Sequence, residues 1–320
     1  MSIHFIGVDA GATATRALVA TAAGAVVGRG SAAGANGWSS GTSPAHAIAT
    51  AVEAALGAHA PATVANGVVG VAGAVSSVPE HAAAVARAWA ALGISAPPRI
   101  ILDVVTAYAA GTTLPRGLVL AAGTGAIAGL VDDGVLLRRA GGRGWLVGDE
   151  GSAVWLGVEG VRATLLALDE RGPATALRQT IPAALGIDAA DLATAITDIV
   201  YSRPPAELGQ LAPLVLGAAE AGDAVAVSLV EAAVEHLAGT AMAAAGDERP
   251  EVVVLAGSLL TRVPAIGQRV RARLTLAWPR ASFVESVSGE AGATALAIRW
   301  HTGKPVSTSV LRALRAGATD

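Results

Sequence analysis

The chain has no cysteine, and only one of its 22 basic residues, Lys304, is a lysine. Without cysteine there is no disulfide, no iron–sulfur cluster, no thiolate zinc site and no cysteine nucleophile. A Walker A loop requires a glycine five positions before its Gly-Lys pair, and that position holds Ile298. The composition therefore excludes a Walker-type ATPase and disfavours lysine Schiff-base chemistry.

Charge and aromatic residues are also sparse. The net charge of the 320 residues is −3 at pH 7, and aromatic residues make up 3%. The slight acidity argues against a nucleic-acid partner. The six histidines form no His-x-x-x-His pair, which disfavours a histidine-based metal site. The length corresponds to about two domains.

Long hydrophobic runs are missing, although alanine raises the mean hydropathy to +0.56. The longest uncharged apolar stretch, residues 117–131, has fifteen residues. A membrane-spanning helix needs about 20. Residues 3–9 lack the basic and apolar segments of a secretory signal. We therefore expect no membrane partner and a cytoplasmic location.

The two halves of the chain repeat one pattern of elements. Apolar runs and turn residues predict strands and helices in each half. In the first half these are strands at 3–8, 16–22, 25–30, 64–71 and 100–103, and helices at 44–58 and 79–92. In the second they are strands at 118–122, 126–131, 135–139, 251–256 and 282–284, a mostly helical region at 185–245, and helices at 290–300 and 307–315. The repeated β-β-β-α-β-α order predicts an α/β fold with two related lobes, each with a mixed sheet, around a central cleft.

Each half begins with a hairpin rich in glycine and threonine. The first is Gly7-Val-Asp-Ala-Gly-Ala-Thr13, and the second contains Gly123-Thr124-Gly125. Backbone amides in such bends form concavities for phosphate oxygens, and Asp9 is placed to orient Mg²⁺, directly or through water. The alternative for each is an ordinary tight turn. Their corresponding places in a duplicated unit favour the phosphate interpretation.

Asp103 ends an apolar strand, where α/β sheets place their ligand sites. A carboxylate there can accept the proton of a substrate hydroxyl. The alternative is the N-cap of a helix over 104–110. The residues alone leave both interpretations open.

Residues 141–152 contain five glycines, more than a simple connection needs. Asp149 and Glu150 are predicted to open a helix, where acidic residues suit the positive end of the helix dipole. Carboxylates beside a closely approaching backbone are also typical of a polyhydroxyl ligand site. Two weaker signals are a loop at 34–38 with an asparagine and a tryptophan, and a buried strand that runs into Gly257. A mobile loop and a simple βα turn are their respective alternatives.

Taken in order, these segments resemble the N-acetylglucosamine kinase family, of the BadF/BcrA-type ATPase group in the actin and hexokinase superfamily. The matching segments are Gly7–Thr13, Asn36–Trp38, Gly67–Gly73, Asp103, Ala122–Gly125, residues 141–152 and Leu255–Ser258. The resemblance implies two ribonuclease-H-like lobes that close over ATP, Mg²⁺ and an amino sugar. It divides the chain into residues 1–115 plus 290–320 and residues 116–289, and it implies a homodimer.

The resemblance also implies roles for individual residues, and Asp103 would be the base that takes the proton of the sugar 6-hydroxyl. The implied phosphate and Mg²⁺ contacts are Asp9, Gly11, Ala12, Thr13, Gly123, Thr124 and Gly125, with Asp9 as the metal residue, through water. The implied adenosine contacts are Ala256, Gly257 and Ser258. The implied sugar contacts are Asn36, Trp38, Ser76, Asp103, Thr124, Gly142 and Asp149.

Two positions depart from the family pattern. Arg143 stands where the family often has tryptophan, and Ala14 where it often has a basic residue. Two other function classes stay open. An activator ATPase of the iron–sulfur branch would need cysteines that this chain lacks, and a non-catalytic sugar- or nucleotide-binding regulator would bind nucleotide without turnover.

Overall fold

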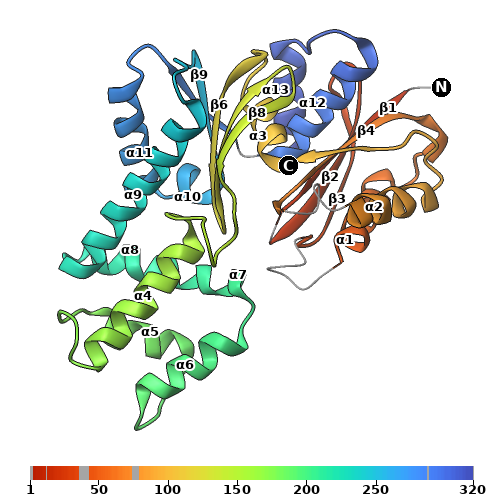
Figure 1. Ribbon diagram of the computed structural model, residues 1–320. Helices are drawn as coiled ribbons and strands as arrows, with labels where there is room; N and C mark the ends of the chain where they lie inside the picture. Colours follow the sequence, from red (N-terminus) through yellow and green to blue (C-terminus); the bar gives the residue numbers. More distant parts are fainter. Residues whose placement is uncertain (1–2, 12, 36–42, 74–78, 287, 320) are drawn as a thin grey trace.

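The computed structural model describes residues 3–11, 13–35, 43–73, 79–286 and 288–319, and Figure 1 shows two sheets with helices around them. The first sheet has the strand order β3-β2-β1-β4-β5. Its strands are β1 (His4–Ala10), β2 (Ala14–Thr21), β3 (Val26–Ala33), β4 (Val64–Val71) and β5 (Arg99–Leu102). The second sheet has the order β10-β9-β6-β7-β8. Its strands are β6 (Arg116–Ala122), β7 (Ala126–Asp132), β8 (Val135–Gly141), β9 (Val252–Ala256) and β10 (Ser282–Ser286).

The two sheets have the same topology. In each, the first strand pairs antiparallel with the second and parallel with the fourth along the chain, and the fourth pairs parallel with the fifth. The expected α/β fold with two related lobes and mixed sheets is confirmed. The turn between β7 and β8 has positive φ at Asp133 and Gly134, as a two-residue type I′ hairpin requires.

Helices of the first half are α1 (Pro44–Leu56), η1 (Pro61–Thr63), α2 (Pro79–Ala91) and α3 (Asp103–Gly111). Two glycines of β3 let α1 approach the sheet closely. A Cβ on Gly28 or Gly30 would collide with the backbone oxygen of Ala55 or Ala51 on α1. Small residues on both surfaces therefore set this spacing, and part of the glycine and alanine content serves packing.

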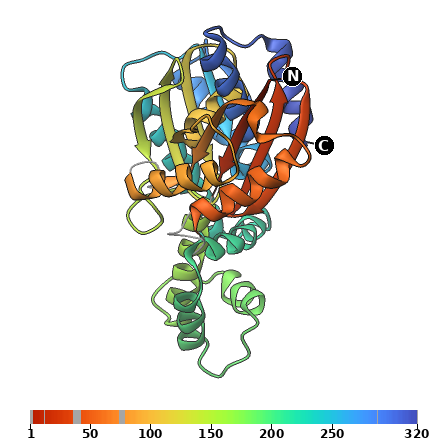
Figure 2. The same cartoon turned by 90° about the vertical axis from the view of Figure 1, so that its right-hand side faces the viewer.

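The second half carries most of the helices. They are α4 (Ala153–Leu168), α5 (Leu177–Leu185), α6 (Leu192–Ser202), α7 (Pro205–Leu208), η3 (Gly209–Leu211), α8 (Ala212–Glu220), α9 (Ala224–Ala245), α10 (Ser258–Thr261) and α11 (Pro264–Ala277). Side chains cap three of them: Ser152 for α4, Asp191 for α6 and Asp223 for α9. Figures 1 and 2 show α4 to α6 projecting away from both sheets.

Among the described residues, α9 is the one helix long and apolar enough to cross a bilayer. One of its faces is buried in the core beside the second sheet, including Val230, Val234 and Leu237. Its exposed side carries Glu235, which pairs with Arg273 of α11 at 2.5 Å. This pattern is typical of the core helix of a globular domain.

The last two helices, α12 (Gly289–Thr302) and α13 (Thr308–Thr319), return to the first sheet. Figure 1 shows α12, in blue, beside the red strands at the start of the chain. Odd-numbered β1 residues face α12: Phe5 packs in a core with α12, whereas Ile6 and Val8 pack with α1 and α2. A Cβ on Gly7 would collide with the backbone of α12. Helix α12, near the end of the chain, thus packs against the strand that leads into the first glycine hairpin.

Candidate active site

The first glycine hairpin joins β1 to β2, and Asp9 is near its tip. Asp9 pairs with Arg16 across the hairpin. Its carboxyl group lies against the first turn of α12, since a Cβ on Gly289 would come within 2.6 Å of Asp9 Cγ. Burial raises the pKa of Asp9 to about 6, and the charge of Arg16 acts in the opposite direction. Asp9 is therefore partly shielded from water.

Two of the glycine amides that the sequence suggested for phosphate binding are already engaged. The Gly11 amide donates to the carbonyl of Ala14 at 3.0 Å, and the Gly123 amide donates to the carbonyl of Gly125 at 2.9 Å. Each bond closes its own bend. In this structure both amides therefore donate within the chain, and the phosphate contacts of Gly11 and Gly123 stay predictions.

The two hairpins meet through their threonines. Thr13 Oγ1 and Thr124 Oγ1 lie 3.1 Å apart, although 111 residues separate them in the chain. Thr13 is exposed. The duplicated hairpins thus bring two hydroxyl groups together where the two sheets approach each other, as the repeat predicts.

Asp103 is the first residue of α3, directly after β5. The N-cap position is Leu102, so the N-cap interpretation of Asp103 is wrong. Burial raises the pKa of Asp103 to about 7. The charges of Asp9 and Asp149 raise it further, while backbone hydrogen bonds from Val104 and Asp103 lower it. These electrostatic interactions place Asp103 near both other acids, and a pKa near neutrality suits a general base.

Asp149 does not open a helix, contrary to the sequence prediction. It has a φ of 58°, and α4 begins at Ala153, capped by Ser152. Burial raises the pKa of Asp149, and backbone hydrogen bonds from Gly144, Ala126 and Arg143 oppose that shift. The glycine-rich segment therefore folds around the Asp149 carboxylate, which explains a glycine density that a helix start does not.

Of the remaining predicted site residues, four are described by the structure and four are not. Gly142 donates its amide to Ala126 at 2.8 Å, and Gly257 lies against the backbone of Ala122 at the end of β6. Both therefore border the second hairpin. Ala256 ends β9, and Ser258 begins α10. Four predicted contacts lie outside the described residues: Ala12, Asn36, Trp38 and Ser76.

Sequence reasoning missed two polar residues at the start of α12. Ser288 is its N-cap residue, and Glu290 is in its first turn. Burial raises the pKa of Glu290 to about 7, as does the nearby charge of Asp9, while Arg16 lowers it. No signal in the linear pattern links Glu290 to Asp9, because only the packing of α12 brings them together. Within the described ranges, no three His, Cys, Asp or Glu side chains form a metal-binding group.

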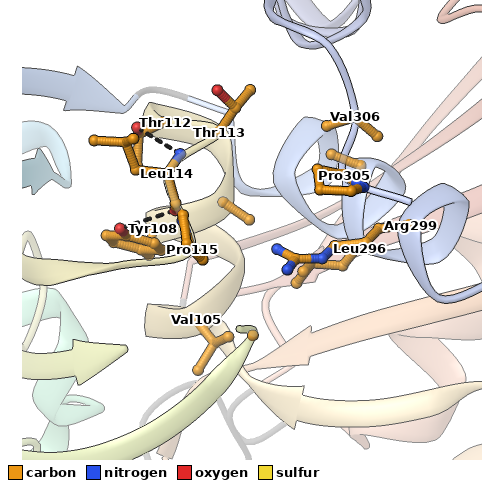
Figure 3. Close-up of a pocket in the computed structure, with 13 residues that line it drawn as sticks. Val105, Tyr108, Thr112, Thr113, Leu114, Pro115, Leu296, Arg299, Pro305 and Val306 are labelled. Carbon is orange, nitrogen blue, oxygen red and sulfur yellow. Dashed lines mark hydrogen bonds between the residues drawn. The ribbon is translucent and has the colours of Figure 1, made fainter. Parts of the chain in front are cut away.

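The hollow in Figure 3 is a separate feature. It lies between α3, α12 and residues 112–115, with Tyr108 and Arg299 among its lining residues. Residues 112–115 come directly before β6, and the second hairpin comes directly after it, so the seven-residue strand separates them. A strand of this length spans about 20 Å. This hollow is therefore at the opposite end of the sheet from the three acids.

Gly125 provides a test of the contact that fixes Asp149. A Cβ at Gly125 would lie 2.6 Å from Asp149 Oδ2. If Asp149 binds substrate, Gly125→Ala is expected to raise the KM for sugar about tenfold or more, because displaced polar groups weaken binding by such factors. The KM for ATP is expected to change little. Steady-state kinetics with each substrate varied in turn measures both effects.

Gly123→Ala is the matched control in the same hairpin. Its Cβ would lie no closer than 3.6 Å to a neighbour, Ser258 Oγ, which is an ordinary contact. It should leave the KM for sugar near the wild-type value. Equal effects of the two substitutions would argue against a specific role of the Gly125–Asp149 contact.

Two solved structures are similar to this chain along most of its length. A proposed N-acetylglucosamine kinase from Chromobacterium violaceum has a similar structure, with a TM-score of 0.71 and 27% identity over 92% of this chain and 99% of that one. A ROK family glucokinase from Streptomyces griseus, solved with glucose and AMPPNP, shares the fold, with a TM-score of 0.55 and 18% identity over 92% of this chain and 98% of that one.

A curated relative matches over a shorter region. The N-acetylmuramic acid/N-acetylglucosamine kinase of Clostridium acetobutylicum is 33% identical over 82 residues. That match spans 26% of this chain and 27% of the relative. The model of the BadF/BadG/BcrA/BcrD ATPase family matches residues 6–294, which include both hairpins and all three acids. The chain belongs to the BadF/BadG/BcrA/BcrD ATPase family.

Proposed function

We propose that the protein transfers the γ-phosphate of ATP to the 6-hydroxyl of an amino sugar, N-acetylglucosamine or glucosamine. The observation that carries this proposal is Asp103 at the start of α3, close to Asp9 and Asp149 and with a pKa of about 7. A carboxylate with that pKa is half ionised near neutral pH and can accept the hydroxyl proton as the sugar oxygen attacks. The 27% identical kinase-like structure and the curated kinase relative support the same activity.

The proposed roles follow the layout of the site. Thr13 and Thr124 would donate to the phosphates from opposite lobes, together with backbone amides of the two hairpins. Gly257 and its neighbours Ala256 and Ser258 would border the adenosine. Asp149 would accept hydrogen bonds from sugar hydroxyls, and Gly142 would provide backbone beside them. Asn36, Trp38 and Ser76 stay predicted sugar contacts, and Ala12 a predicted phosphate contact.

The residues around Asp9 fit a hydrated Mg²⁺. The donor atoms are carboxylate oxygens, and Gly289 lets the Asp9 carboxyl group lie where a Cβ would otherwise collide with it. Mg²⁺ in such sites uses one or two carboxylates, several waters and the substrate phosphates. When bound, the ion would neutralise charge on the phosphates during transfer. Asp9 would hold it, and Asp103 would act on the proton of the sugar.

We also propose the lobe boundaries at residues 1–115 plus 290–320 and at 116–289. The packing of α12 on β1 and β4, and of α13 on β3, supports the assignment of the C-terminal residues to the first lobe. Closure of the lobes on sugar would exclude water, which otherwise competes as an acceptor. The homodimer stays a prediction. Sedimentation equilibrium, which measures the molar mass in solution, tests it.

A panel of acceptors tests the proposed function. Release of ADP is measured by a coupled assay with glucosamine, N-acetylglucosamine, glucose and N-acetylmuramate. We expect ADP release to depend on sugar, with a higher kcat/KM for an amino sugar than for glucose. Absence of sugar-dependent ADP release from all four would refute the kinase proposal. Nucleotide binding without turnover would instead support a regulator.

A further inference from the structure

The first turn of α12 places two buried polar side chains beside Asp9. Ser288 is 4% exposed and Glu290 is 5% exposed. Ser288 Oγ and Glu290 Oε2 have no hydrogen-bond partner among the residues that the structure describes. Gly289, between them, lies against the Asp9 carboxyl group. Three oxygen-bearing side chains therefore gather at one helix end, and two of them hold buried oxygen atoms without a partner.

This arrangement is unfavourable for the chain alone. Burying a carboxylate without a partner is costly, and a second carboxylate nearby adds repulsion. The N-terminus of α12 offsets part of the negative charge. Arg16 is within electrostatic range of Glu290, but its side chain is exposed, and no ion pair joins the two among the described residues. A positive charge between Asp9 and Glu290 would resolve both costs.

We propose that Glu290 is a second carboxylate for the magnesium ion of the Mg–ATP complex, directly or through water, with the Ser288 hydroxyl as a further oxygen donor. This inference rests on the proposed use of ATP. The donor set contains only oxygen atoms, which Mg²⁺ prefers, and the number of carboxylates matches the one or two that such sites use. Glu290 is a positioning residue in this assignment, because it acts on the phosphates through the ion.

The test measures nucleotide binding without sugar and without turnover. Isothermal titration calorimetry gives the Kd of AMPPNP in excess Mg²⁺ and in EDTA. The Kd in EDTA divided by the Kd in Mg²⁺ is the factor by which Mg²⁺ strengthens nucleotide binding. We expect Glu290→Gln to reduce that ratio 10- to 100-fold, the usual cost of losing a supporting ligand. In EDTA the variant should bind at least as tightly as the wild type, because a negative charge near the phosphates is gone.

Two further variants and a control make the result specific. Glu290→Asp keeps the charge and should restore part of the ratio, and Ser288→Ala should reduce it less than Glu290→Gln does. Glu53→Gln, on the exposed side of α1, should leave the ratio unchanged. A wild-type ratio in Glu290→Gln would overturn the assignment. The calorimetric ratio could fall as expected in Glu290→Gln while the wild type phosphorylates no sugar. That pair of results would overturn the proposed function and leave this inference standing.

Discussion

Asp103→Asn is expected to lower kcat for sugar phosphorylation by about 10²- to 10⁴-fold, the usual contribution of a positioned general base. Asparagine has nearly the same shape but cannot accept the proton of the sugar hydroxyl. Because the base acts in the transition state, the KM for sugar should change much less than kcat. Initial rates of ADP release at saturating and subsaturating sugar separate the two parameters.

The pH dependence gives an independent check on the same residue. The pKa of Asp103 is raised to about 7, so the carboxylate is protonated and inactive at lower pH. In the wild type, kcat/KM should therefore reach a plateau above that pH and fall about tenfold per unit below it. This acidic limb should vanish in Asp103→Asn. Asp198→Asn, an exposed position on α6, should keep both the rate and the limb. Near-wild-type turnover of Asp103→Asn would contradict the base assignment.

Gly257→Ala is expected to disrupt the second sheet and nucleotide binding together. Gly257 has φ 83° and ψ 150°, a region that only glycine populates freely. A Cβ there would also collide with the backbone oxygen of Ala122, beside the second hairpin. The two effects should cost at least about 3 kcal/mol and lower Tm by about 5 °C or more. Thermal melting and calorimetric titration with AMPPNP measure the outcomes.

Gly222→Ala separates backbone strain from collision. Gly222 also has a positive φ, 88°, but nothing lies within 4 Å of its Cβ position. Its substitution should cost only about 1 kcal/mol and leave nucleotide affinity intact. If both variants melted at the same temperature with the same nucleotide affinity, the contact between Gly257 and Ala122 would have no special importance.

The fold was predictable because its signals are local. Apolar runs such as 64–71 and 118–122 mark buried strands, and the glycine bends between strands mark hairpins. The repeat of these signals indicated two similar sheets. Asp103 could be singled out for the same reason, since it follows a strand directly. Its interaction with Asp9 depends on β1, β4 and β5 lying side by side, which the parallel order implies.

Other features of the site depend on contacts that the sequence does not encode locally. Asp149 and Glu150 look like a helix start, but Ser152 provides the cap, and the Asp149 carboxylate is held by backbone amides. Glu290 looks like an ordinary first-turn acid until α12 packs against β1. In the sequence, Gly28 and Gly30 cannot be distinguished from the glycines of the site. Only the position of α1 against β3 shows that they allow close packing.

The most direct measurement of the central claim is a proton–phosphorus correlation NMR spectrum of the reaction products. Protein, Mg²⁺, ATP and N-acetylglucosamine or glucosamine are incubated, and the carbon that carries the new phosphate is identified. The account predicts ADP together with a sugar phosphate whose phosphorus couples to the two protons on carbon 6. Phosphate on carbon 1, or release of inorganic phosphate with unmodified sugar, would contradict it.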